Sequence, residues 1–280
     1  MSKKRNKPKK EGQKIKDSDP GFDKYKYYLR SVQSPENDVI FLRDVYKELK
    51  GKKPITLRED FCGTFAILCE WVKLSKSHLG IGIDLDREPT IYGRDRNWAK
   101  LDAFQQERVN VLNENVLSKG LPQADIVVAM NFSYFIFKTR ATMKDYFSKS
   151  FASLNEGGLF VIDCFGGSAC QQPNEEETVH KNFSYFWDQE SFDPITNHAL
   201  FHIHFKLKGE KRRRESVFRY DWRMWSIPEL RDIMEEVGFR RTHVYWEGST
   251  KDGDGNGEFT RMEACNEDCE AWVAYIVGEK

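Results

Sequence analysis

The sequence has no long run of apolar residues. Of its 280 residues, 39% are hydrophobic and 31% are charged. No stretch approaches the roughly 18 consecutive apolar residues of a membrane helix, and the first residues lack the apolar core of a secretory signal peptide. These absences disfavour a membrane or secreted protein. We expect a cytoplasmic protein, with enough chain to bury one large core or a core with a sizeable insertion.

The six cysteines do not form a framework of closely spaced pairs, so we expect reduced thiols rather than structural disulfides. Cys265 and Cys269 have the spacing of half a metal site, but no second pair lies nearby in the sequence. His202 and His204 alternate onto one face of an expected strand, again without identifiable further ligands. We therefore predict no bound metal.

The chain has no net charge, but its charges are unevenly distributed. Residues 1–16 contain eight Lys or Arg and one Glu, a net charge of +7, so the remainder carries −7. We expect residues 1–18 to be a disordered basic tail. Such a tail can be a solubilising arm, a contact for nucleic acid or a nuclear address. The acidic remainder argues against a broad groove for nucleic acid.

From residue 55 onward, short apolar segments alternate with segments of helical periodicity. Parallel strands covered on both faces have this pattern. We predict a doubly wound α/β domain over residues 51–280, with a mostly parallel seven-stranded sheet and ligands at the carboxyl ends of its strands. Two helices within residues 19–50 precede it. The first five strands are expected at residues 55–60, 79–85, 108–116, 124–131 and 157–165.

The pattern changes after the fifth strand. Residues 167–222 contain aromatic-rich segments separated by short turns, which predict an antiparallel insertion. A helix follows over residues 227–239, with Pro228 in its first turn and Gly238 at its end. We expect the last two strands at residues 241–248 and 269–279, joined by a flexible loop that includes residues 250–259.

The turn after the first strand, "REDFCGTF", is poor in glycine. Gly63 alone lets backbone approach a ligand closely, and neither a phosphate loop nor a full Gly-x-Gly-x-x-Gly motif is present. The turn is therefore poorly suited to a pyrophosphate. It suits an uncharged adenosine that carries an amino acid, whose ammonium group Glu59 would meet. Phe61 and Phe65 stand where such turns have glycine.

Polar residues also follow the next two strands. Asp84 lies at the tip of the second strand, where a carboxylate can accept both hydroxyls of a ribose. Asp86, two residues on, is equally consistent with a helix cap. After the third strand, Asn115 can offer its amide to an adenine edge, and the backbone of Val116 can face the ring. Taken alone, Asn115 is typical of a turn.

These segments resemble the motifs of class I S-adenosylmethionine-dependent methyltransferases. "LREDFCGTF", "GIDLD", "NENVL", "ADIVVAMNFSYFIF" and "LNEGGLFVIDCF" stand in the order and approximate spacing of that family's Rossmann-like domain, and further segments are similar to a bacterial branch of it. The resemblance covers residues 55–165 well. It implies S-adenosyl-L-methionine as cofactor. It also implies three sets of contacts: the methionine part with Glu59, Cys62 and Gly63, the ribose with Asp84, and the adenine with Asn115 and Val116.

Members of this family often close an aromatic N-terminal helix over the cofactor. Residues 19–50 are the matching segment, and Tyr25, Tyr28 and Arg30 are its candidates. An Arg can pair with the methionine carboxylate, and a Tyr can cover the sulfonium. The alternative is that these side chains pack on the edge of the sheet.

The methyl acceptor is less constrained. Asn131 and Tyr134, after the fourth strand, stand where family members that methylate amides or exocyclic amines carry Asn-Pro-Pro-Tyr, although both prolines are missing. Asn131 can border the cofactor and Tyr134 the acceptor. In the insertion and after it, Trp187 and Trp246 can box a flat or cationic substrate, or can belong to the core. Arg223 can clamp a substrate carboxylate or form an ordinary ion pair.

We expect an enzyme that methylates an amine or oxygen of a small molecule. The sulfonium is a strong electrophile, so the protein chiefly supplies proximity and a dry pocket, and no residue is assigned as a general base. Two alternatives stay open. One is an RNA or protein methyltransferase that uses the basic tail. The other is a catalytically silent binding module, for which Phe61 and Phe65 in the cofactor turn are the sequence argument.

Overall fold

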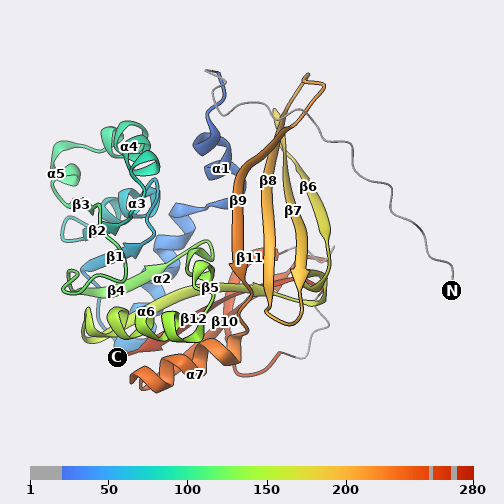
Figure 1. Ribbon diagram of the computed structural model, residues 1–280. Coiled ribbons are helices and arrows are strands. Elements are labelled where there is room, and N and C mark those ends of the chain that lie inside the picture. Colours follow the sequence, from blue (N-terminus) through green and yellow to red (C-terminus); the bar gives the residue numbers. More distant parts are fainter. Residues whose placement is uncertain (1–20, 252–254, 266–269) are drawn as a thin grey trace.

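The computed structural model describes residues 21–251, 255–265 and 270–280 (Figure 1). The predicted basic tail, residues 1–18, lies outside the described residues, and so does Cys269. Two sheets dominate the described chain: an eight-stranded central sheet flanked by helices, and a four-stranded sheet beside it. No helix in the described ranges combines the length and the apolar character that crossing a membrane requires.

The central sheet is mostly parallel and doubly wound, which confirms the predicted fold class. Its order is β11-β10-β12-β5-β4-β1-β2-β3, and β1 pairs in parallel with both β2 and β4. The chain moves outward from β1 to β3 and then returns to β4, so the carboxyl ends of β1 and β4 flank the crevice where such sheets bind ligands. The strands are β1 (Thr56–Asp60), β2 (Leu79–Ile83), β3 (Val109–Leu112), β4 (Ala124–Ala129), β5 (Leu154–Gly166), β10 (Arg241–Ser249), β11 (Gly255–Met262) and β12 (Trp272–Glu279).

The sheet has one strand more than the seven predicted. The expectation of a loop over residues 250–259 is wrong in its second half, because β11 begins at Gly255 and pairs antiparallel with β10. Phe259 explains the difference. Its ring packs on Tyr275 of β12, with centroids 4.5 Å apart, and on Phe41, 5.7 Å away. An aromatic anchor thus holds a Gly-rich strand on the sheet edge.

Helices cover both faces of the sheet, because successive strand residues point to opposite sides. In β4, Ile126 and Val128 belong to the apolar cluster beneath α2 and α3, whereas Val127 and Ala129 belong to the cluster beneath α6 and α7. Helix α7 has Pro228 in its first turn and ends at Gly238, as predicted. The helices are α1 (Lys24–Val32), α2 (Pro35–Lys50), α3 (Ala66–Leu74), α4 (Arg87–Arg96), α5 (Ala103–Gln106), α6 (Arg140–Ala152) and α7 (Ile227–Val237), with short 3₁₀ turns η1 (Trp98–Lys100), η2 (Ser133–Ile136) and η3 (Ser168–Gln171).

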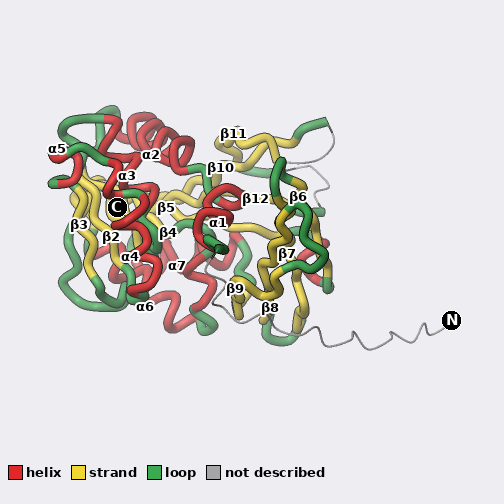
Figure 2. The backbone as a smooth tube through the Cα atoms, turned by 90° about the horizontal axis from the view of Figure 1, so that it is seen from above, coloured by secondary structure: helices red, strands yellow, loops and turns green. Residues whose placement is uncertain are grey.

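The second sheet is the antiparallel insertion after β5. It comprises β6 (Asn174–Val179), β7 (Phe183–Asp193), β8 (His198–Leu207) and β9 (Arg214–Arg223), in that order. Strand β6 escapes sequence analysis because all of its residues are exposed, so it has no apolar alternation. Figure 2 shows the sheet beside the central one, with α1 between them. Tyr27 and Tyr28 of α1 pack on the rings of Phe183 and Phe218, each at 4.9 Å.

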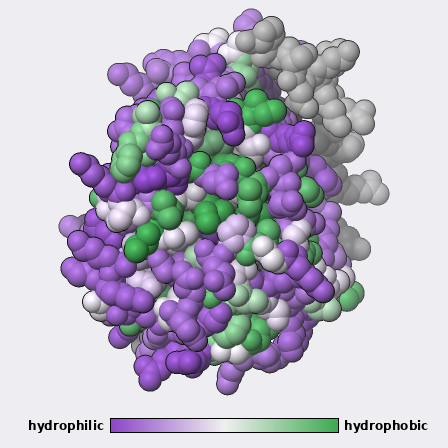
Figure 3. Space-filling model, turned by 90° about the vertical axis from the view of Figure 1, so that its left-hand side faces the viewer, coloured by the Kyte–Doolittle hydropathy of each residue, from purple (hydrophilic) through white to green (hydrophobic). Residues whose placement is uncertain are grey.

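Charged and polar residues cover most of the one face that Figure 3 shows. Figure 3 shows the face that lies on the left of Figure 1, where a small group of apolar residues is surrounded by hydrophilic ones. Most buried apolar residues fill the two clusters on either side of the central sheet, and a third, smaller cluster lies in the insertion.

Candidate functional site

The turn after β1 keeps a left-handed backbone at its two phenylalanines. Phe61 has φ 58° and Phe65 has φ 42°, and Gly63 between them has φ 50°. Such angles cost roughly 1–2 kcal/mol for a residue with a Cβ. Ring packing offsets this cost: Phe61 lies 5.7 Å from the ring of Tyr146, and Phe65 is buried. The turn therefore has left-handed backbone angles at three positions, of which only Gly63 is a glycine.

Close packing between the turn and the facing helix α4 depends on a glycine in the helix rather than one in the turn. Gly93 of α4 packs against the turn, and a Cβ added to it would lie 2.3 Å from the carbonyl oxygen of Thr64 and 2.6 Å from the ring of Phe65. Asn97 donates a hydrogen bond of 3.0 Å to the same carbonyl. Sequence analysis missed Gly93, although a glycine inside a helical segment is a signal for such contacts.

Gly63 and Asp84 are brought together. The Gly63 N–H donates to Asp84 Oδ2 at 2.7 Å, and the Asp86 N–H donates to Asp84 Oδ1 at 2.8 Å. The open side of Gly63 is free, because an added Cβ would meet only Pro89, at 4.0 Å. Asp86 accepts from the Glu88 N–H and caps α4. The ends of β1 and β2 thus present an open backbone next to a carboxylate.

Glu59 is a buried carboxylate with an unused oxygen. The backbone of Leu68, in the first turn of α3, donates to the carboxylate, but Oε2 has no hydrogen-bond partner among the described residues. Burial raises the pKa of Glu59 well above its usual range, and nearby carboxyls, Asp38 first, raise it further. Cys62 is also buried, with its Sγ against Gly82, and burial raises the pKa of its thiol.

The loop after β3 lies against the end of β2. Asn113 donates to the carbonyl oxygens of Asp84 and Leu85, at 2.9 and 2.8 Å. Asn115 is exposed and accepts from the Leu117 N–H at 2.9 Å, the turn contact that its sequence position alone suggested. Val116 is buried in the core, which leaves its backbone as the part that can face a ligand.

The turn after β4 is fixed by a carboxylate from β5. Asn131 and Phe132 both have φ 56°, and their N–H groups donate to the two oxygens of Asp163 at 2.5 and 2.8 Å. Burial raises the pKa of Asp163 to about 7. Tyr134 is fully buried, and its hydroxyl donates to the Asp163 carbonyl at 2.7 Å. The assignment of Tyr134 to the acceptor site is therefore corrected: this side chain belongs to the core.

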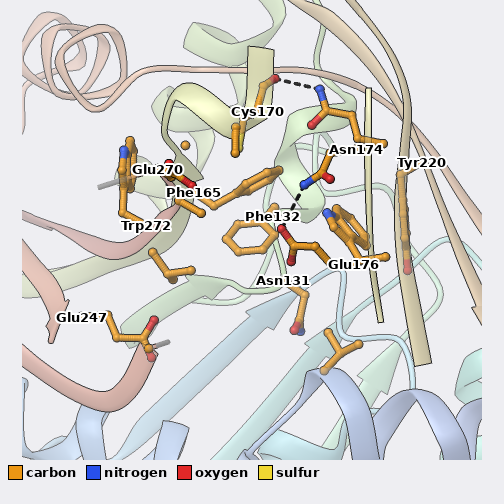
Figure 4. Close-up of a pocket in the computed structure, with 18 of the residues that line it drawn as sticks. Asn131, Phe132, Phe165, Cys170, Asn174, Glu176, Tyr220, Glu247, Glu270 and Trp272 are labelled. Carbon is orange, nitrogen blue, oxygen red and sulfur yellow. Dashed lines mark hydrogen bonds between the residues drawn. The ribbon is translucent and has the colours of Figure 1, made fainter. Parts of the chain in front are cut away.

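A cavity of about 920 Å³ lies between the inner face of the insertion and the ends of β5, β10 and β12 (Figure 4). Four of the predicted site residues line it: Tyr28, Asn131, Trp187 and Trp246. In Figure 4, Asn131 and Glu176 lie close together, whereas Glu247 and Trp272 lie across the cavity from them. The site is thus built from segments far apart in the sequence.

The cavity wall is acidic and aromatic. Three carboxylates line it, and the described lining contains no Lys, Arg or His. None of the three forms an ion pair within the described part of the chain; Glu176 accepts from Asn174 at 3.2 Å and Glu247 from the Gly257 N–H at 3.0 Å. The carboxylates are Glu176, Glu247 and Glu270, and the aromatic residues are Tyr28, Phe132, Phe165, Tyr185, Trp187, Tyr220, Trp222, Trp246 and Trp272.

Two predicted arginines do not reach this wall. Arg223 pairs with Glu229 at 3.2 Å and stacks on Trp225, with its guanidinium 3.8 Å from the ring centroid. This is the ordinary ion pair that sequence analysis left open. Arg30 is exposed and lies over the ring of Phe183, at 5.3 Å. The structure thus brings neither side chain to the cavity, because each is held by a neighbour elsewhere.

His202 and His204 of β8 both pair with carboxylates, His202 with Glu190 and His204 with Asp188 and Glu215. Ligand atoms of Glu175, Asp188 and His204 lie within 4.8 Å of one another, a spacing compatible with a metal ion. However, Arg213 pairs with Glu175 at 2.7 Å, and the Ser216 N–H donates to His204 Nδ1 at 2.7 Å. These groups therefore satisfy one another, and the residues do not carry an argument for a metal.

No family model matches the chain, and no curated protein matches it in sequence. Solved structures do. CalS10, an amino pentose methyltransferase from Micromonospora echinaspora, matches with a TM-score of 0.63 at 15% identity over 91% of this chain and 97% of its own. An S-adenosylmethionine-dependent methyltransferase from Clostridium acetobutylicum matches with a TM-score of 0.61 at 14% identity, over 90% of this chain and 96% of its own. The sugar N-methyltransferase KedS8 from Streptoalloteichus matches with a TM-score of 0.57 at 13% identity, over 98% of this chain and 98% of its own. The chain has the fold of the class I S-adenosylmethionine-dependent methyltransferases.

Proposed function

We propose that the protein transfers a methyl group from S-adenosylmethionine to an amine nitrogen of a small molecule. The observation that carries this proposal is the cavity wall, whose three carboxylates have no cationic partner among the described residues and are surrounded by aromatic rings. Carboxylates and ring faces both attract ammonium groups. A wall of this kind favours an amine and disfavours an anionic acceptor.

The cofactor would lie along the carboxyl ends of β1 and β2. Glu59 offers its unused oxygen to an ammonium, Gly63 offers open backbone, and Asp84 offers a carboxylate to the ribose. Asn115 and the backbone of Val116 would face the adenine. When bound there, S-adenosylmethionine supplies an activated methyl group. Asn131, at the end of β4, borders the acceptor cavity and links it to this edge of the sheet.

The protein's own part is to orient the acceptor and exclude water. Trp187 of β7 and Trp246 of β10 both line the cavity and would hold the substrate body, while Glu176 beside Asn131 would hold the reacting nitrogen. A protonated amine must lose a proton before its nitrogen can attack the methyl group, and a carboxylate of the wall can accept that proton. Effective transfer then depends on alignment, which can supply much of the rate enhancement.

Helix α1 is proposed as the lid. It bridges the two sides of the crevice: Lys24 pairs with Glu88 of α4 at 2.6 Å, Tyr92 of α4 donates to Asp23 at 3.0 Å, and Tyr28 lines the cavity. Because no residue of α1 is fully buried, the helix can move away to admit ligands. Residues 19–50 would then combine a mobile α1 with a fixed α2.

Neither sequence alternative gains support. An acidic cavity wall repels the phosphates of RNA, and the basic tail proposed to bind it lies outside the described residues. A silent binding module was suggested by Phe61 and Phe65, but both residues keep the left-handed turn that a cofactor loop needs. The names of CalS10 and KedS8 also favour an amino group on a sugar as one acceptor class.

The test is methyl transfer from radiolabelled S-adenosylmethionine to a panel of aliphatic amines and amino sugars, each paired with the analogue that carries hydroxyl in place of amine. We expect labelled product from one or more amines and none from the paired alcohols. Transfer to alcohols alone would overturn nitrogen as the acceptor. Failure to bind either S-adenosylmethionine or S-adenosylhomocysteine in calorimetry would overturn the methyltransferase proposal itself.

A further inference from the structure

Carboxyl groups from four elements converge beside the cofactor turn. Glu59 is the last residue but one of β1, Asp84 follows β2, Asp163 lies on β5, and Asp38 comes from α2, which precedes the whole sheet. The charge of Asp38 raises the pKa of both Glu59 and Asp163. Among the charged groups that raise the pKa of Glu59, Asp38 has the largest effect. None of the four forms an ion pair with a Lys, Arg or His within the described ranges. Sequence analysis singled out Glu59 and Asp84 but not Asp38.

Two of these carboxyls have capacity left for a ligand. Glu59 receives the Leu68 backbone N–H, but its Oε2 is buried without a partner. Asp38 accepts from the Tyr275 hydroxyl at 3.2 Å and is partly buried. An unpartnered buried carboxylate oxygen is costly unless a cation or donor reaches it. The free oxygen of Glu59, next to a second carboxyl, therefore calls for a small positively charged group.

We propose that Asp38 acts with Glu59 as the second carboxylate of one ammonium site, which binds the amino group of the cofactor's methionine part. This inference rests on the proposed function, because it needs a cofactor that carries an amino acid. It assigns α2 a direct role in binding: the helix covers the sheet and also delivers a ligand-binding carboxylate. An ammonium offers three donors, which two carboxylates can satisfy better than one.

Proton release follows from this arrangement. Burial raises the pKa of Asp38 to about 6 and that of Glu59 well above its usual range, so the empty site holds protons more tightly than two free carboxyls would. An ammonium stabilises the ionised forms, so binding expels a proton. The other titratable groups that face these two are Glu36, Asp60, Cys62, Cys69, Asp84, Asp163 and Tyr275.

The test compares two ligands on three proteins. S-adenosylhomocysteine carries the amino group, whereas 5′-methylthioadenosine lacks the amino-acid part. We expect Asp38→Asn to weaken S-adenosylhomocysteine binding about tenfold and to leave 5′-methylthioadenosine within about twofold of the original protein, as measured by calorimetry. Asp44→Asn, which removes an exposed carboxylate farther along the same helix, is the matched control and should change neither affinity.

A second readout is the proton itself. Titrations of S-adenosylhomocysteine at pH 7 in phosphate and in Tris differ in heat by the number of protons released, and we expect this number to fall in Asp38→Asn. Unchanged affinity and unchanged proton release in Asp38→Asn would overturn the inference, as would equal weakening of both ligands, which indicates a structural role. If the original protein bound neither ligand, the proposed function would fail as well.

Discussion

The two halves of the site are built by different means. On the proposed cofactor side, Glu59 lies near the end of β1, while Gly63 and Asp84 follow β1 and β2, and the fold gathers them because the carboxyl ends of such strands share one edge. On the acceptor side, the cavity is enclosed by α1, the insertion and the last strands. The first half is encoded locally, whereas the second depends on contacts between distant segments. Substitutions in the two halves should therefore differ in kind.

The largest effect is expected where the turn meets α4. Gly93→Val would place side-chain carbon within 2.3 Å of the Thr64 carbonyl oxygen, a backbone atom that cannot move without displacing the turn. We expect the free energy of unfolding to fall by about 3 kcal/mol and S-adenosylhomocysteine binding to be lost. Urea unfolding measures the change in stability, and calorimetry measures the loss of binding. Ile91→Val, an exposed site on the same helix, is the control, and equal behaviour of the two variants would contradict the proposed contact.

Substitution of Phe65 should change the free energy of unfolding less, because two effects of the substitution oppose each other. Removal of its buried ring costs several kcal/mol, but glycine relieves the left-handed strain, so Phe65→Gly should lower the free energy of unfolding by about 2 kcal/mol. Phe65→Ala loses the ring and keeps the strain. We expect it to be about 1 kcal/mol less stable than the glycine variant in urea unfolding. An alanine variant as stable as the glycine variant would show that the backbone at this position carries no strain.

Asp163 joins the two halves, and its effect depends on pH. Its pKa is raised to about 7 by burial, above the unfolded value of about 4, so the folded state holds the proton more tightly. Its contribution to stability is therefore full below pH 4 and is lost as the pH rises through about 7. We expect Asp163→Asn to flatten the fall in the urea midpoint between pH 4.5 and 8.

The control for this pH profile is Asp125, whose pKa is lowered by hydrogen bonds from Asn155 and the backbone of Thr56 and Ile55, although burial opposes this. Its contribution has the opposite sign and is lost as the pH falls. Asp125→Asn should therefore leave the fall toward pH 8 intact. An unchanged profile in Asp163→Asn would mean that other buried carboxyls dominate the slope.

The approach of Gly63 to Asp84 could be predicted from the sequence, whereas the orientation of several residues expected near the acceptor could not, for a physical reason. Glu59, Gly63 and Asp84 lie at predictable ends of strands, and the contact between Gly63 and Asp84 follows from the sheet alone. Tyr134 and Arg223 also lie near strand ends, but their orientation is set by partners elsewhere, the Asp163 carbonyl and Glu229. Strand β6 has no apolar pattern, so Glu176, which it carries to the cavity, could not be identified either.

The smallest expected effect separates binding from stability in the acceptor half. Glu176 is exposed to the cavity and forms no ion pair with a described residue, so Glu176→Gln should leave the free energy of unfolding within about 0.5 kcal/mol. It should raise the KM for an amine acceptor about tenfold, because a partly enclosed carboxylate then no longer meets the ammonium.

Glu177→Gln is the matched control, since successive residues of a strand point to opposite sides and Glu177 does not line the cavity. Steady-state kinetics at saturating cofactor should show a normal KM for it. Similar KM values in the two variants would mean that the acceptor does not bind beneath β6. The insertion would then not build the acceptor half of the site, and the contrast with the locally encoded cofactor half would no longer hold.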